Sequence, residues 1–144
     1  MRDTSKQLRN AVFACLDGNL GGVPIFDEKR WVNSAATLFV LCSTQQETPT
    51  EDNDCTWINR SSIDLEIISK TGSEVTKDTI DDLSNTILTL LLPTRSTSGV
   101  TPPAGLEFTN PIVESVISRN ISLSETESIL QKTIRFVVTI VQKN

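Results

Sequence analysis

Residues 57–92 read WINRSSIDLEIISKTGSEVTKDTIDDLSNTILTLLL, and the spacing of apolar residues changes once along this stretch. Ile63, Leu65 and Ile67 alternate with acidic residues, which is the period-2 pattern of a half-buried strand. After a polar turn, apolar residues recur at helical spacing until Pro93 ends the helix. Because this helix has one apolar stripe, it needs a sheet face on which to pack.

The flanking sequence predicts a second helix and further strands. The stretch 35–44 is apolar on both faces, which is typical of a strand covered on both sides. Pro111 interrupts an extended stretch, which we interpret as two short strands or one bent strand. The predicted elements in chain order are a helix at 4–17 capped by Thr4 or Ser5, strands at 23–26, 35–44 and 57–69, a helix at 76–92, a loop at 93–103, extended chain at 105–123 and a strand at 129–142.

This order predicts one α+β domain over residues 1–144, with a mostly antiparallel sheet of about four to five strands. Both helices should pack on one sheet face, because each has a single apolar stripe. Phe39, Leu41 and Ile68 are then candidates for the opposite face. A partly apolar, uncovered face often marks an assembly surface, so we take Phe39 and Leu41 as candidate contact residues.

Composition and charge narrow the function classes. The chain has a net charge of −5 and no basic cluster, which argues against non-specific binding to nucleic acid phosphates. No apolar run reaches the ~18 residues of a membrane span, and no signal peptide is visible. We expect a protein that is made and used in a cytoplasm, with no membrane partner.

Residues suited to catalysis are scarce. The chain contains no His and no Tyr, so a Ser–His–Asp or Cys–His site cannot be built within one chain. Neither a P-loop nor a GxGxxG motif is present. We therefore predict that the protein is not an enzyme, and that it has no catalytic, cofactor-binding or metal site and no cofactor.

Cysteines and clustered carboxylates have simpler explanations than a metal site. The cysteines form no CxxC pair, and reduced, buried thiols are the expected state. The acids of the second helix lie near its N-terminus, where the helix dipole favours them. Asp64 and Glu66 lie on the polar side of their strand, which predicts a solvated face or an intersubunit salt bridge. The cysteines are Cys15, Cys42 and Cys55, and the helix acids are Asp78, Asp81 and Asp82.

The polar stretch 45–56, QQETPTEDNDCT, joins two predicted strands and contains four acids and no base. It is either a solvated loop or a contact or gating loop that reaches beyond the domain body. The loop at 93–103 is rich in Pro, Ser and Thr, and we expect it to move. Candidate contact residues in these two segments are Glu47, Glu51, Asp52, Asp54 and Arg95.

The layout resembles the tail-terminator or tail-completion family of tailed bacteriophages. An N-terminal helix leads to VPIFDEKR (23–30), and AATLFVLCSTQQ (35–46) precedes a polar hairpin tip. CTWINRSSIDLEIISKTG (55–72) is similar to the second hairpin strand of that family, which enters a long helix through a polar turn. IRFVVTIVQKN (134–144) matches the C-terminal apolar strand.

Two departures leave the role within this family open between terminator, neck adaptor and another ring component. The His often found before the last strand of these proteins is replaced by Gln131, Lys132 and Thr133. The segments 93–103 and 105–123 are also longer than that family leads one to expect.

The resemblance implies a structural, non-enzymatic virion protein at the head–tail junction, or neck. Such proteins close into homo-oligomeric rings, commonly hexamers, that cap the tail tube and dock head-completion or neck proteins. DNA passes through the lumen without specific binding, and an acidic surface suits that passage because it repels phosphate. The implied location is the virion tail or neck, after assembly in the host cytoplasm. The alternative is a non-virion assembly chaperone or small adaptor that binds a partner through its polar hairpin.

Overall fold

Two helices and five strands make up the part of the chain that the structure, a computed structural model, describes: residues 2–27, 37–50, 56–70, 77–122 and 128–143. The strands form one sheet in the order β1-β2-β3-β5-β4, with β1 parallel to β2 and every other pair antiparallel. The predicted α+β class is confirmed. The elements are α1 (Ser5–Leu16), β1 (Ile25–Asp27), β2 (Leu38–Pro49), β3 (Thr56–Ser69), α2 (Lys77–Leu91), β4 (Leu106–Ser122) and β5 (Ser128–Lys143).

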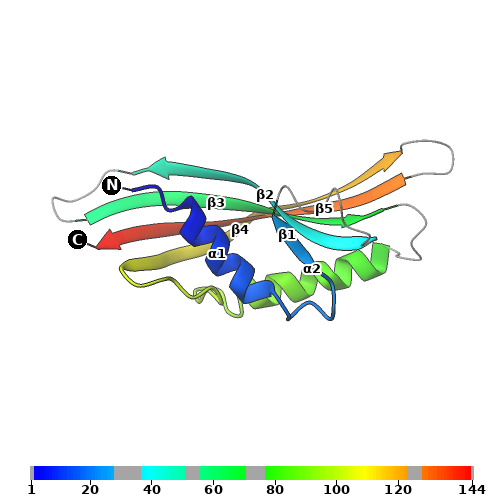
Figure 1. Ribbon diagram of the computed structural model, residues 1–144, viewed down its shortest axis with the longest axis horizontal. Helices are drawn as coiled ribbons and strands as arrows, with labels where there is room; N and C mark the ends of the chain where they lie inside the picture. Colours follow the sequence, from blue (N-terminus) through cyan, green and yellow to red (C-terminus); the bar gives the residue numbers. More distant parts are fainter. Residues whose placement is uncertain (1, 28–36, 51–55, 71–76, 123–127, 144) are drawn as a thin grey trace.

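The strand at the centre of the sheet is β3. It pairs with β5 without a register shift from Thr56 opposite Lys143 to Ser69 opposite Leu130, and it pairs with β2 along its other edge. The long strands run along the longest axis of the molecule (Figure 1). Every residue of β3 that alternates toward the helices from Ile63 onward is buried, so its period-2 pattern positions the core.

Both helices pack on the same face of the sheet, as predicted (Figure 1). The single apolar stripe of each helix is buried in one cluster with the inward side chains of β2, β3 and β5. At about 25 cal/mol per Å² of apolar area, burial of such stripes is the main favourable contribution to folding. The buried apolar helix residues are Leu8, Val12 and Leu16 in α1, and Ile80, Leu83, Ile87 and Leu91 in α2.

The ends of α1 differ in part from the prediction. Neither Thr4 nor Ser5 caps the helix with its side chain. The carboxylate of Asp3 instead accepts the backbone N–H of Ser5 at 2.8 Å. At the other end Gly18 follows the helix with a φ of +77°, a conformation that glycine adopts at little cost, as its place after Asp17 predicts.

One strand is longer than predicted, and another takes one of its two predicted forms. β2 continues to Pro49 after an irregularity between Cys42 and Gln45, so residues 45–49 are strand and not part of a loop tip. Residues 106–122 form one strand, which is the second of the two predicted alternatives. β4 accommodates its proline through Asn110, at a φ of +50°, and through two register shifts against β5, which lie between Thr109 and Ile112 and between Val113 and Ser115.

The second half of the loop at 93–103 is anchored to the body of the domain, and the expectation that the loop moves stays a prediction. Val100 is buried in the main core, and the backbone N–H of Gly99 donates to the carbonyl of Leu91 at 2.9 Å. A Cβ on Gly99 would lie 1.8 Å from the carbonyl oxygen of Leu90, so only glycine fits this close approach.

Phe39 and Leu41 lie on the face that the helices leave uncovered, but they are buried. With Ile68 they form a second, smaller cluster against which Phe26 and Ile129 pack. The rings of Phe26 and Phe39 meet edge to face with their centroids 5.8 Å apart. The interpretation of Phe39 and Leu41 as an open contact surface is therefore wrong for the single chain, because neighbouring strands supply side chains that cover them.

Burial raises the pKa of the Cys42 thiol to about 11, and Cys42 is 2% exposed. We expect Cys42 to resist alkylation by iodoacetamide near neutral pH until the protein is unfolded, because its thiolate is almost absent. The half-buried Cys15 should react sooner. Peptide mass spectrometry measures both rates, and fast alkylation of Cys42 in the folded protein would contradict the expectation.

The same thiol makes stability depend on pH. A pKa raised by folding contributes stability that is complete below the unfolded-state pKa of 9.0 and is lost as the pH rises through about 11. The free energy of unfolding should therefore fall over this range, and less steeply in Cys42→Ala. Equal slopes in the two proteins would show that other groups account for the decline.

Candidate functional site

Glu47 was predicted to be a contact residue, but its carboxylate binds groups within the molecule. Its Oε1 accepts the backbone N–H of Thr4 at 3.3 Å, the hydroxyl of Thr4, and Nδ2 of Asn59 at 2.9 Å. Thr4 and Asn59 are fully buried. Glu47 therefore joins the start of α1 to β2 and β3 within the chain, and its role in an external contact stays a prediction.

Two glutamines extend this anchor at the same end of the sheet. Gln45 donates its amide to the carbonyl of Ser5 at 2.8 Å and accepts from the guanidinium of Arg9 at 3.0 Å. Gln142 donates to the carbonyl of Arg2 at 2.9 Å and accepts its N–H at 3.3 Å. Both ends of the described chain are thus held together at one end of the sheet (Figure 1).

Glu47→Ala should lower the free energy of unfolding by about 2–3 kcal/mol, because Thr4 and Asn59 would keep buried donors without this acceptor. Glu107→Ala is the matched control. Glu107 pairs with Lys143 in a largely exposed ion pair, so its loss should change stability by less than about 1 kcal/mol. Urea unfolding of the two variants measures both values, and equal losses would contradict the anchoring role of Glu47.

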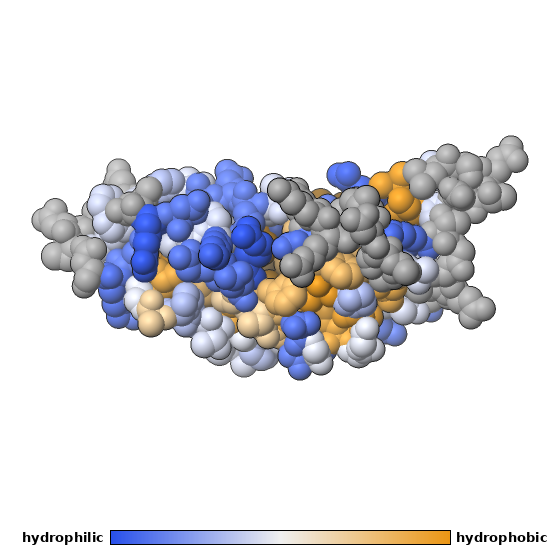
Figure 2. Space-filling model, in the orientation of Figure 1, coloured by the Kyte–Doolittle hydropathy of each residue, from blue (hydrophilic) through white to orange (hydrophobic). Residues whose placement is uncertain are grey.

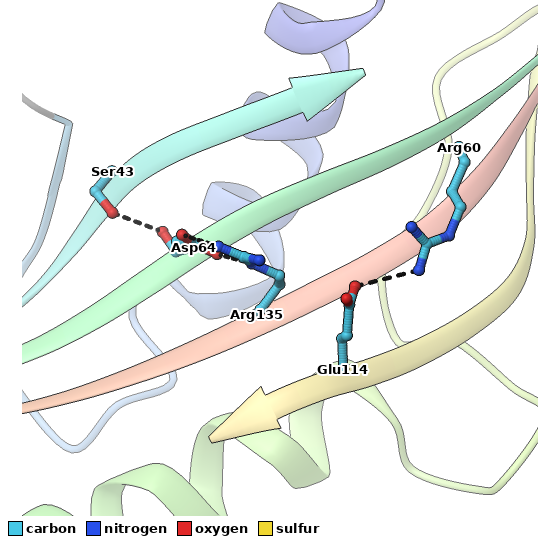
Figure 3. A network of polar contacts seen from close by, with 5 residues as sticks. All are labelled: Ser43, Arg60, Asp64, Glu114 and Arg135. Carbon is cyan, nitrogen blue, oxygen red and sulfur yellow. Dashed lines mark hydrogen bonds and ion pairs between the residues drawn. The ribbon is translucent and has the colours of Figure 1, made fainter. Parts of the chain in front are cut away.

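A network of ion pairs crosses the sheet face that the helices leave uncovered (Figure 3). The guanidinium of Arg135 donates to both oxygens of Asp64, at 2.8 and 3.2 Å, which is the strong bidentate form of this pair. Ser43 donates to the backbone carbonyl of Asp64 at 3.4 Å. Beside them Arg60 and Glu114 pair at 3.2 Å. The network thus connects β2, β3, β5 and β4.

Asp64 contradicts the sequence interpretation. It is neither solvated nor left for a neighbouring subunit, because it is 8% exposed and paired within the chain. The hydrogen bond from Arg135 to Asp64, followed by the charge of Asp64, raises the pKa of the Arg135 guanidinium. Arg135 therefore stays charged, and a carboxylate that accepts two of its hydrogen bonds is poorly placed to abstract a proton.

A double-mutant cycle on Asp64→Ala and Arg135→Ala should give a coupling energy of about 1–2 kcal/mol, because the pair is bidentate and Asp64 is buried. The pair formed by Arg60 and Glu114 is the control. Both partners are about half exposed, so their coupling should be below about 1 kcal/mol. Thermal or urea unfolding of the two sets of variants measures the energies. Similar coupling in the two cycles would contradict the ranking.

Two small hollows on the surface carry paired charges. One of about 60 Å³ lies beside the open-face network, and one of about 190 Å³ lies between α2 and the β4–β5 hairpin. In the second, Lys132 of β5 pairs with Asp81 of α2 at 2.6 Å, so this acid connects the helix to a strand. Within the described residues, no three His, Cys, Asp or Glu side chains gather where they could hold a metal ion.

The other predicted contact residues have different outcomes. Arg95 is exposed in the loop after α2, where a partner can reach it. Glu51, Asp52 and Asp54 lie outside the described residues. Their role as contacts stays a prediction.

The exposed apolar residues of β4 were missed by the sequence interpretation. They make up four of the five exposed large hydrophobic side chains in the described part of the chain. Figure 2 shows hydrophobic residues at the outer end of the β4–β5 hairpin. The available signal was that apolar residues in the stretch IVESVISRNI follow no single period, so both faces of the strand carry some. These residues are Ile112, Val116, Ile117 and Ile121.

No protein-family model and no curated protein matches this chain. Among the described helices, none combines the length and the apolar character that crossing a membrane requires.

Proposed function

We propose that this protein is a structural subunit that forms a ring at the head–tail junction of a tailed bacteriophage. The observation that supports this most is the order of the elements. A helix, a short strand, a long β-hairpin, a second helix and a long terminal strand follow one another as in the layout on which the resemblance to tail-completion proteins rests. The ring caps the tail tube, joins it to head-completion or neck proteins and lets DNA pass.

The polar contacts are consistent with a building block. The ion pairs and the carboxylate of Glu47 tie strands and a helix to one another, which makes a rigid frame. The net charge of −5 favours a lumen that repels DNA phosphates and does not retain them. In this proposal the protein is not an enzyme and needs no cofactor.

Native mass spectrometry of the purified protein, together with peptide mass spectrometry of purified particles, tests the proposal. A closed multimer of more than two copies in solution and the protein in tailed particles are expected. A chaperone or adaptor would be present in infected cells and missing from finished particles. Absence from particles, or a protein that forms no assembly larger than a dimer at any concentration, would overturn the proposed function.

A further inference from the structure

The outer edge of β4 has the features of a strand-pairing surface. β4 is the last strand in the sheet order, and no described strand lies beyond it. Its first half is irregular, but residues 115–121 pair with β5 in unbroken register. An exposed sheet edge presents a row of backbone N–H and C=O groups that can pair with another strand. Ile117, 47% exposed, lies in the middle of this regular segment.

The pairing with β5 assigns each β4 side chain to a face of the sheet. Ile117 lies opposite Thr133 and Arg119 opposite Gln131, and these partners are in phase with Arg135 of the open-face network. Glu114 also points to this open face, because it pairs with Arg60. The open face therefore carries Ile112, Glu114, Ser115, Ile117, Arg119 and Ile121, and the helix face carries Val113, Val116, Ser118 and Asn120.

We propose that β4 pairs antiparallel with β4 of a second copy, in a register centred on Ile117. Ile117 then lies opposite Ile117 of the second copy, and Arg119 lies opposite the bulge formed by Glu114 and Ser115. The extra residue at this bulge brings Ile112, and not Val113, opposite Ile121 of the second copy. All the apolar partners and the charged partners therefore lie on the same face, as antiparallel pairing requires.

Neighbouring registers lack this complementarity. A register centred on Ser118 places Ile117 opposite Arg119 of the second copy, and one centred on Arg119 places two guanidinium groups opposite each other. Like charges directly opposite are destabilising, whereas apolar and oppositely charged pairs each contribute about 0.2–1 kcal/mol. Of these three registers, the one centred on Ile117 is self-complementary, and this complementarity favours a second copy over an unrelated partner.

The contact does not rest on the proposed function. A two-fold contact of this kind closes at two copies, so it cannot build a ring by itself. A ring requires a different surface, and β4 pairing can join two subunits or two rings. Failure of the ring experiment leaves the dimer possible, and failure of β4 pairing leaves the ring possible.

Sedimentation equilibrium of wild type and Ile117→Lys is the first test. Wild type should associate through β4, and Ile117→Lys should raise the dissociation constant of this contact about tenfold or more, because two ammonium groups meet at the two-fold axis. Trp57→Lys is the matched control, because Trp57 is the one exposed large apolar side chain outside β4 among the described residues. Thermal unfolding checks that both variants fold. Association that Ile117→Lys leaves unchanged would overturn the proposal.

Disulfide mapping tests the register directly, in a background with Cys15→Ser and Cys55→Ser. Copies that carry Ile112→Cys, mixed with copies that carry Ile121→Cys, should crosslink on mild oxidation, because opposed residues have Cα atoms about 4.5–5.5 Å apart. Ile121→Cys alone is the control, since its two copies lie several residues apart along the strands. Crosslinking no faster in the mixture than in the control would overturn the register.

Discussion

Burial of two helix stripes against one face of a β3–β5 pair is the constraint on which the rest of this structure depends. β3 and β5 pair along the whole length of β3, and their inward side chains form the floor of the main core. Each helix has only one apolar side, so both must lie on that floor. This arrangement leaves the opposite sheet face without helical cover. Apolar side chains on that face must be buried by neighbouring strands, and its charged side chains must be paired or solvated.

The uncovered face contains an apolar cluster and a buried ion pair. At one end Phe39, Leu41 and Ile68 bury one another with help from neighbouring strands. Nearer the middle, Asp64 and Arg135 neutralise each other across β3 and β5. A buried carboxylate without such a partner would be costly, so the guanidinium is a condition for placing an acid in this position. Over β2, β3 and β5 the face is therefore closed around Phe39 and balanced in charge around Asp64.

The same layout explains where an exposed apolar surface remains. β4 is the outermost strand beside β5 and extends along the hairpin, where its neighbours cover little of it. In the proposed pairing with a second copy, this bulge brings Ile112 opposite Ile121 and places Glu114 near Arg119 on the open face. A sheet edge with apolar side chains is a natural place for association with another strand.

The pattern of apolar residues was enough to predict the type of each element and the packing of both helices on one face. The spacing of apolar residues distinguishes strand from helix locally. A helix with a single apolar stripe can bury only that one side. Only the tertiary structure decided the partners of Glu47 and Asp64, the burial of Phe39 and the length of β2. Asp64 and Arg135 are 71 residues apart, and no local period carries information about contacts at such separations. The sequence of residues 57–69 is therefore equally compatible with an Asp64 carboxylate that contacts water, a neighbouring subunit or an arginine of the same chain.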